Sequence, residues 1–410
     1  MNHCPTPVPQ NPRLSREGWL LVFVAISLAL YGLIMVFSVT AGQILARHYH
    51  THRGLPSALP STNRFLFVQG IFIFGGIIAM SMAAWFRPAT YKKLMIPGLI
   101  LAMILLAGVL VFGQSVNGAR RWYRFSVFSL QPMEAAKIAL IVYLAVILEK
   151  RAHIMQDMWK GFAQPMLVVG AMVFLLLKQN DFGSAVLFLT VATALLFMAG
   201  SRLYYFLMAG AVTIPLLWLY VAGGWRLSKR IIPFLYPQHF TQDAAYQIIR
   251  SLDAFGSGTV TGFGLGNGPY KMEFLPEAHT DYIAAMIGQE FGFVGTMVLL
   301  FLYALFFYSG VRIALRHRKN LFRFYVCIGI TLTIILQAMI NLSVVMNLIP
   351  SKGITLPFVS YGGSSILLSF LALGILLSMD RHPVRDESPV AVTEQPHTAG
   401  VKKRLLPLPS

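Results

Sequence analysis

The chain has 410 residues, of which 56% are hydrophobic and only 12% are charged, and its mean hydropathy is +0.66. This composition is typical of integral membrane proteins and excludes a secreted or cytosolic enzyme. The 33 Lys and Arg residues outnumber the 15 Asp and Glu residues, and in a membrane protein this excess indicates anionic lipid, rather than nucleic acid, as the charged partner.

Apolar runs long enough to cross a membrane recur along the chain. A helix needs about 20 residues to span a hydrocarbon core, and its backbone polar groups must all be bonded there. The fourth run spans only if Glu134 and Lys137 pair one helical turn apart. The sequence therefore predicts an all-α polytopic membrane protein with ten transmembrane helices at residues 19–39, 65–85, 94–113, 133–148, 161–177, 182–200, 203–224, 291–311, 324–349 and 358–379.

Ten spans divide the chain into a membrane domain, 19–379, and two tails, 1–18 and 380–410, on the same side of the membrane. Lys and Arg are more frequent in the segments that face the cytoplasm if both tails are cytoplasmic, which favours that orientation. The C-terminal tail is rich in Pro and charge and is predicted to be disordered.

The segment 225–280, between the seventh and eighth spans, is predicted to form a large outer-face loop, and loops of this length are usually functional. Its Gly262, Gly264, Gly266 and Gly268 resemble a phosphate-binding run. No predicted strand precedes them and no ribose-binding acid follows, so a dinucleotide site is rejected. The spacing favours a tight turn in a re-entrant segment.

Outer-face cations are unusual in membrane proteins, yet Arg120, Arg121 and Arg124 lie together beside Trp122. Guanidinium groups bind phosphate oxygens in pairs of hydrogen bonds, and the indole can lie against a sugar ring or at the membrane interface. The cluster indicates an anionic substrate group. Contact with outer-leaflet lipid phosphates is the alternative.

Glu134 and Lys137 in the fourth span form either a structural ion pair or, through Lys137, a contact to a lipid pyrophosphate. Gln337 and Asn341 share one face of the ninth span, which is typical of hydrogen bonds between helices. Asp181 lies in a short polar turn at the start of the sixth span and is interpreted as structural.

Asp281 stands where the large loop re-enters the membrane, directly before an apolar helix. A low local dielectric raises the basicity of such a carboxylate and nearby cations lower it, the tuning that allows it to take a proton from a sugar hydroxyl. Asp is also favoured at helix starts, so helix capping is an alternative that is compatible with catalysis. In the last outer loop, 349–365, Pro and Gly hold an irregular backbone, which is tolerated near a membrane only where it lines a cavity or packs on protein. Lys352 is expected to face the cavity that this loop lines.

Together these motifs resemble the FtsW/RodA/SpoVE (SEDS) family of bacterial shape, elongation, division and sporulation proteins, over residues 19–380. The forms AHTD at 278–281 and SKGITLP at 351–357 are more similar to the division branch, FtsW, than to the elongation branch. The sequence departs from the family at Val68, Met133 and Asn180, where a basic residue, Ser and Pro are usual. The resemblance rests on NGARRW at 117–122, QPMEAAK at 131–137, NDFGSA at 180–185, YQIIRSLDAFGSG at 246–258, GFGLGNG at 262–268, LPEAHTDYI at 275–283 and IPSKGITLPFVSYGGSS at 349–365.

The resemblance implies a peptidoglycan glycosyltransferase that polymerises lipid II at the outer face of the bacterial inner membrane, at the division septum, and releases undecaprenyl pyrophosphate. It implies that Asp281 is the catalytic base for the 4-hydroxyl of the acceptor GlcNAc. No cofactor is certain, and a divalent cation, Mg²⁺ or Mn²⁺, is left open. The residues that would bind substrate are Arg120, Arg121, Trp122, Lys137, His279, Thr280 and Lys352.

The implied partners are lipid II and undecaprenyl-linked glycan, a class B penicillin-binding protein with transpeptidase activity, other membrane proteins of the divisome, and membrane lipid. Two alternatives remain, a lipid II flippase and a membrane scaffold for the penicillin-binding protein. A flippase predicts polar residues that continue into the cytoplasmic half of the spans, whereas the informative ones gather at the outer end. This distribution favours the outer-face enzyme.

Overall fold

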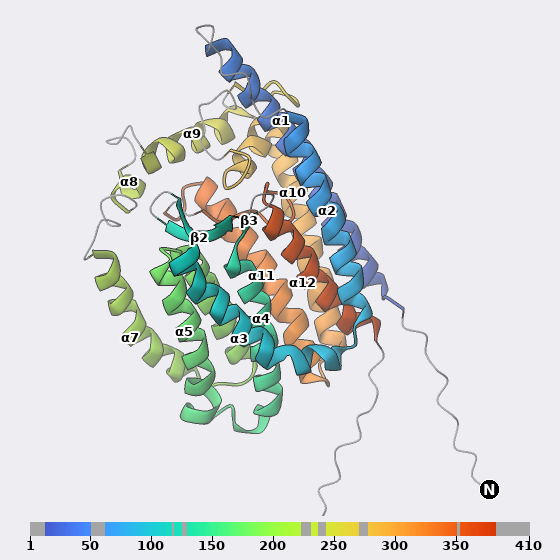
Figure 1. Ribbon diagram of the computed structural model, residues 1–410, viewed down its shortest axis with the longest axis vertical. Coiled ribbons are helices and arrows are strands. Elements are labelled where there is room, and N and C mark those ends of the chain that lie inside the picture. The colour runs from blue at the N-terminus through green and yellow to red at the C-terminus, as the bar shows by residue number, and fades with distance from the viewer. Residues whose placement is uncertain are drawn as a thin grey trace, which may run out of the picture.

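The computed structural model describes residues 13–50, 62–116, 119–124, 129–222, 231–236, 243–269, 278–350 and 353–382. These residues fold into a helical bundle with one small antiparallel sheet (Figure 1). The strands are β1 (Gln114–Val116), β2 (Ala119–Arg124) and β3 (Ser129–Leu130), and a 3-10 turn, η1 (Ala152–Ile154), and a π-helical turn, η2 (Met158–Ala163), precede α5. The helices are α1 (Arg16–His50), α2 (Thr62–Trp85), α3 (Pro88–Phe112), α4 (Pro132–Lys150), α5 (Gln164–Lys178), α6 (Phe182–Met198), α7 (Leu203–Ala222), α8 (Ile232–Leu235), α9 (Asp243–Ser257), α10 (Ile283–Arg316), α11 (Leu321–Val345) and α12 (Gly363–Arg381).

Seven of the described helices are long and apolar enough to cross a membrane, which agrees with the predicted polytopic helical fold. α6 and α7 contribute shorter apolar helices. α4 carries Glu134 and Lys137 near one end and two further charges at the other. The count of ten spans stays a prediction. The small sheet was not expected, and it places the arginine cluster on β2.

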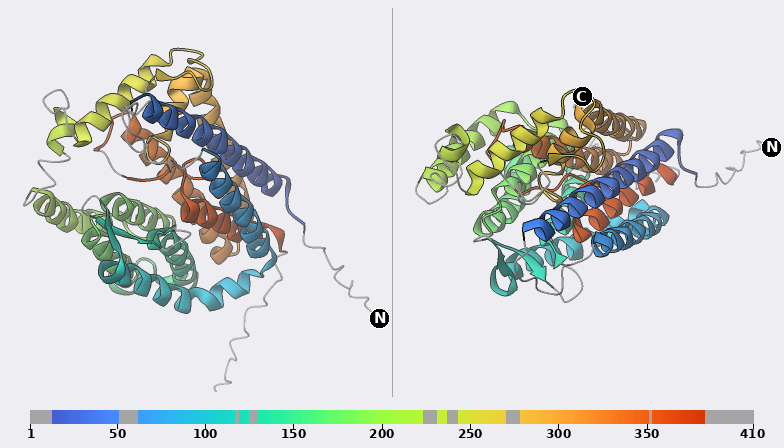
Figure 2. Two further views of the ribbon diagram at one scale, coloured as in Figure 1. Left: turned by 45° about the horizontal axis from the view of Figure 1, so that its top comes forward. Right: turned by 90° about the horizontal axis from the view of Figure 1, so that it is seen from above.

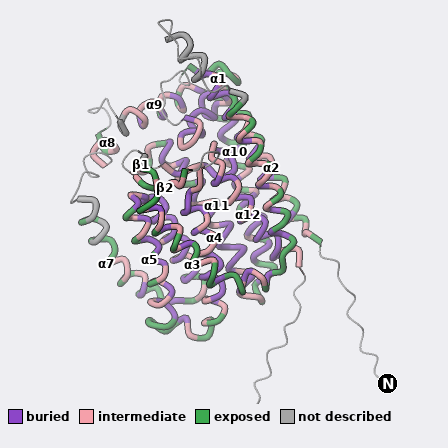
Figure 3. Tube along the Cα trace, viewed as in Figure 1, coloured by how far each residue is buried: buried purple, intermediate pink, exposed green. Residues whose placement is uncertain are grey.

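The bundle is built around α10, α11 and α12. α10 packs against α1 and α11, and α4 contacts both α3 and α11. Figure 2 shows α1, α2 and α12 running side by side, and α12 packs most closely against α2. Figure 3 shows buried residues in the interior and exposed residues along the outer sides of α2 and α3. Large apolar side chains such as Phe67, Phe74 and Ile104 are exposed there, as expected for surfaces that contact lipid.

α1 approaches the loop before α12 closely because a glycine faces it. A Cβ on Gly32 would lie 2.2 Å from the carbonyl oxygen of Val359, so even alanine would clash. Small residues allow such close backbone contact between membrane segments, where packing rather than hydrophobicity drives association.

α10 begins at Ile283, eight residues before the expected span 291–311, and it is broken at Gly292, whose φ of 62° and ψ of −155° are accessible to glycine almost alone. The break frees the N–H groups of Phe293 and Val294. They donate instead to the carbonyls of Thr259 and Val260, at 3.0 and 3.1 Å, in the segment that follows α9. This segment includes the glycine run, which therefore forms a turn against α10, as the spacing favoured.

The two ends of the described bundle meet. α12 extends to Arg381, so Asp380 belongs to the helix and not to the tail that was expected from residue 380. Its buried carboxylate accepts a hydrogen bond from the Ser15 N–H at 2.9 Å and pairs with Arg316 at 3.0 Å. This contact joins the start of α1, the end of α10 and the end of α12.

Candidate active site

The segment that carries Asp281 is held through its backbone. Three consecutive carbonyls, of residues 279–281, accept hydrogen bonds from the last loop and from α11. The donors are the Tyr361 N–H at 2.9 Å, the Ser360 hydroxyl at 2.6 Å and the Asn341 side-chain amide at 2.8 Å. Asn341 also donates to the Ile354 carbonyl at 2.7 Å. The amide that was interpreted as a link between helices thus links two loops at the site.

Asp281 and Arg121 meet at Gly353. A Cβ on this glycine would lie 2.9 Å from Asp281 Oδ2 and 3.8 Å from Arg121 Nη1, so both side chains border the same small space. The N-cap of α10 is Tyr282, and it makes no side-chain capping bond. Asp281 lies one residue before this N-cap position.

Arg121 is oriented by the turn before α6. Its guanidinium donates to the carbonyl of Asn180 and lies 3.8 Å from Asp181, whose carboxylate is buried. Asp181 is also the N-cap of α6, where it accepts the Ser184 hydroxyl at 2.7 Å. Sequence reasoning assigned Asp181 a structural role and gave no signal of its contact with an arginine some 60 residues away.

Asn180 explains one departure from the family pattern. Its φ of 61° lies in the left-handed region, which asparagine tolerates and which the proline ring cannot adopt. The carbonyl that binds Arg121 therefore depends on a backbone conformation that the usual family residue would not allow.

Arg120 is not brought to Asp281, because successive side chains of a strand point to opposite faces. It is exposed and donates to the Leu110 carbonyl at 3.0 Å, in the last turn of α3. Trp122 lies on the same strand and is half-buried. Tyr123 anchors the strand by donating to the Leu105 carbonyl at 3.0 Å, and burial raises the pKa of its hydroxyl.

Glu134 and Lys137 form a buried ion pair, with Lys137 Nζ 2.6 Å from Glu134 Oε2. Lys137 also donates to Gln337 Oε1 at 2.5 Å, and the amide of Gln337 donates to the Thr355 carbonyl at 3.0 Å. Ser365 donates to Glu134 at 3.3 Å. The pair therefore connects α4, α11, α12 and the last loop, one helical turn from Asn341.

His279 belongs to a cluster of three rings with Phe65 and Tyr361, whose centroids lie 5.5 to 6.0 Å apart. Thr280 beside it is half-buried. Lys352, also expected at the site, lies outside the described residues.

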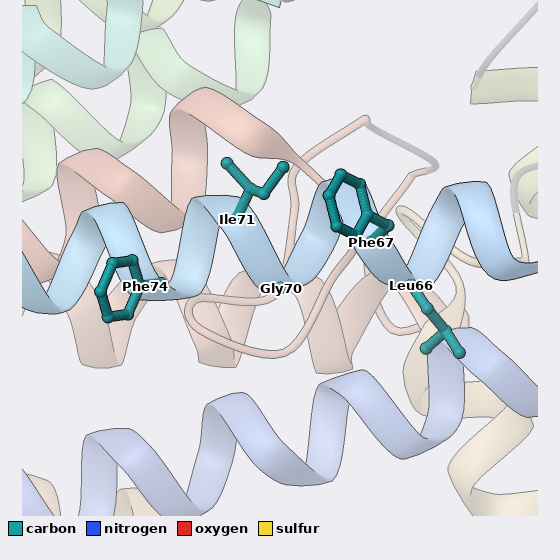
Figure 4. Close-up of a pocket in the computed structure, with 5 residues that line it drawn as sticks. All are labelled: Leu66, Phe67, Gly70, Ile71 and Phe74. Atoms are coloured by element: carbon teal, nitrogen blue, oxygen red, sulfur yellow. The ribbon is translucent and has the colours of Figure 1, made fainter.

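A shallow, open apolar surface lies along one side of α2. Figure 4 shows the side chains that line it, and they come from successive turns of this helix: Leu66, Phe67, Gly70, Ile71 and Phe74.

The described side chains around Asp281 do not form a metal-binding cage. Within the described ranges, no three His, Cys, Asp or Glu side chains gather in an arrangement that could hold an ion. Asp281 is a possible oxygen ligand, but Arg121 beside it places positive charge in the same space.

Comparison with known proteins places the chain among bacterial cell-wall proteins. A family model described as "Cell cycle protein" for FtsW, RodA and SpoVE matches residues 18–384. The probable peptidoglycan glycosyltransferase FtsW of Geobacter metallireducens is 37% identical over 368 residues, which are 89% of this chain and 95% of that protein. The protein of the same name from Aliivibrio salmonicida is 35% identical and covers 88% of each chain.

Two solved structures share the fold. A chain from a peptidoglycan synthase complex that coordinates polymerization and crosslinking has a TM-score of 0.72, is 26% identical and covers 88% of this chain and 97% of its own. The rod-shape-determining protein RodA of Thermus thermophilus has a TM-score of 0.64, is 26% identical and covers 90% and 98%. This chain therefore belongs to the FtsW/RodA/SpoVE family of cell cycle proteins.

Proposed function

We propose that this multi-pass membrane protein is a peptidoglycan glycosyltransferase of the FtsW type, which polymerises lipid II during septal cell-wall synthesis. Relatives that carry this name cover most of the chain. The observation that carries the proposal is that the Asp281 carboxylate and the Arg121 guanidinium both border Gly353, beside the start of α10. A base beside a cation suits a reaction between a hydroxyl and a sugar that bears a pyrophosphate.

In this reaction Asp281 takes the proton of the acceptor GlcNAc 4-hydroxyl. The hydroxyl oxygen forms a bond to the anomeric carbon of the donor sugar. The bond from that carbon to the pyrophosphate oxygen breaks, and the electron pair leaves with undecaprenyl pyrophosphate. Arg121 stabilises the charge that develops on the leaving oxygens. Because the Asn180 carbonyl and Asp181 already orient the guanidinium, little reorganisation is needed during the reaction.

The surroundings of the site suit a lipid-linked sugar. The open apolar surface along α2 is the proposed contact for the polyprenyl chain. His279 and Thr280 are the proposed contacts to the sugars, whereas Trp122 lies on the strand face opposite to that of Arg121. Lys137 acts mainly through its ion pair with Glu134.

The proposed partner is a class B penicillin-binding protein in the divisome, which would crosslink the strands that this chain makes. A solved relative comes from a complex that coordinates polymerization and crosslinking, which supports this pairing. The proposed location is the septal inner membrane, with both termini in the cytoplasm.

The test of the activity is polymerisation of purified lipid II by the purified chain, alone and with its cognate penicillin-binding protein. We expect glycan strands, in larger yield with the partner. Transfer of lipid II across proteoliposome membranes without any polymer would instead favour the flippase. Absence of both polymerisation and transfer would favour the scaffold.

The orientation can be tested by cysteine labelling in spheroplasts, in a background from which Cys4 and Cys327 have been removed. Ser257→Cys, at the end of α9, is expected to react with a membrane-impermeant maleimide. Lys319→Cys, in the exposed turn between α10 and α11, is expected to react only after permeabilisation. The reverse pattern would invert the orientation and place the site on the cytoplasmic face.

A further inference from the structure

The outer end of α10 is a separate short segment, because the break at Gly292 interrupts its hydrogen bonds with the rest of the helix. Two carbonyls on the outer side of the break, of Gln289 and Glu290, accept hydrogen bonds from the N–H groups of Phe263 and Gly264, at 3.1 and 2.9 Å. The segment that follows α9 therefore replaces the missing helical bonds. The orientation of residues 283–291, which follow Asp281, depends on this inserted turn.

The glycine run can lie here only because it lacks side chains. A Cβ on Gly262 would lie 2.2 Å from the Glu290 carbonyl oxygen, and one on Gly258 would lie 1.9 Å from that of Gly288. Gly262 also has a φ of 78°, which side chains disfavour. The turn and the break are thus built to fit each other.

A buried carboxylate ties this turn to the bundle. Glu290 is fully buried, and its two carboxylate oxygens lie 2.6 and 2.7 Å from the Ser38 hydroxyl of α1. The Gly266 N–H donates to Glu290 Oε2 at 3.3 Å. One side chain therefore connects α1, the inserted turn and the outer segment of α10. Burying a carboxylate is unfavourable unless hydrogen bonds compensate for the lost hydration, and the bonds from Ser38 and Gly266 provide this compensation for Glu290.

We propose that Glu290 is a positioning residue for Asp281, an inference that rests on the proposed function. Through Ser38 and Gly266, Glu290 holds the inserted turn against Gly292 and so fixes residues 283–291. This segment in turn sets where the Asp281 carboxylate stands relative to Arg121 and Gly353. Glu290 does not contact substrate.

The kinetic test compares Glu290→Ala with Glu290→Gln in lipid II polymerisation. Small misplacement of a catalytic group reduces the rate strongly, so Glu290→Ala is expected to lower kcat by about 10-fold to 100-fold with KM changed by less than about 3-fold. Glu290→Gln keeps an oxygen that accepts from Gly266 and Ser38, and it is expected to retain most of kcat. Equal loss in the two variants would indicate proton transfer by Glu290 and overturn the proposal.

A second measurement does not depend on activity. Hydrogen–deuterium exchange at Phe263, Gly264, Phe293 and Val294 is expected to be faster in Glu290→Ala, with α11 unchanged. Unchanged exchange at these amides, or a wild-type kcat in Glu290→Ala, would contradict the role of Glu290. The proposed function would still stand if the wild type polymerises lipid II. If the wild type makes no polymer, the proposed function fails, and exchange alone decides whether Glu290 holds the turn.

Ser38→Ala provides a milder variant if Glu290→Ala does not fold, because it removes only a hydroxyl. Its matched control is Ser309→Ala, a fully buried serine on the other side of the break, whose hydroxyl has no partner in the described structure. Ser38→Ala is expected to lower kcat and to speed exchange at Phe263 and Gly264, whereas Ser309→Ala should do neither. Equal behaviour of the two serine variants would count against the proposal.

Discussion

Asp281→Asn is expected to reduce glycan-strand formation by about 100-fold to 10,000-fold, the range typical for loss of a positioned general base. The substitution is nearly isosteric, and asparagine retains a side-chain oxygen that can accept a hydrogen bond at a helix start, so helix capping alone predicts a small loss. The backbone carbonyl that accepts from Asn341 is also retained. The measurement is the rate of polymer formation from lipid II by the purified variant in complex with its partner, alongside its thermal stability.

Asp253→Asn is the matched control for this change. Asp253 lies on α9, and its carboxylate is 40% exposed in an ion pair of 3.6 Å with Arg250, so its loss should change the rate and the stability little. Polymer at the wild-type rate from Asp281→Asn would remove the general base from the mechanism. A rate that falls only in proportion to lost folded protein would point to a structural role.

Hydropathy predicted most membrane helices because every backbone polar group in lipid must be bonded within its own segment. α2, for example, ends at residue 85, as expected. Residues 283–290 of α10 lie outside the predicted span because Gln289 and Glu290 lower the local hydropathy, and because the break in the helix is compensated by hydrogen bonds from the segment after α9. Contacts of that kind join residues that are distant in sequence, so no local pattern reports them.

The candidate site was predictable in composition but not in arrangement. The motifs grouped Arg120 with Arg121, whereas the strand separates them and directs only Arg121 to the space beside Asp281. Asp181 had the local signal of a helix cap and gave no sign of its contact with Arg121. The pairing of Glu134 with Lys137 was readable because both lie on one helix, at the i and i+3 spacing that brings side chains together.

Lys137→Met is expected to destabilise the protein by on the order of 3–5 kcal/mol, because it leaves the buried Glu134 carboxylate without its cation. It also removes the donor to Gln337, which holds the Thr355 carbonyl in the last loop. Adding Glu134→Gln removes the uncompensated charge, so the double variant should recover much of the lost stability. The measurement is reversible unfolding of each variant in detergent, together with polymerisation of lipid II.

Lys92→Met is the matched control, because Lys92 pairs with Glu149 at a similar distance, 2.8 Å, but the two side chains are 32% and 27% exposed. Water solvates the remaining carboxylate there, so the loss should stay below about 1 kcal/mol. Equal losses for Lys137→Met and Lys92→Met would contradict the assignment of Glu134 and Lys137 as a structural pair. A double variant that is stable but makes polymer slowly would show that Lys137 also acts on the substrate, whereas one that matches the wild type in both measurements would confine Lys137 to its structural role.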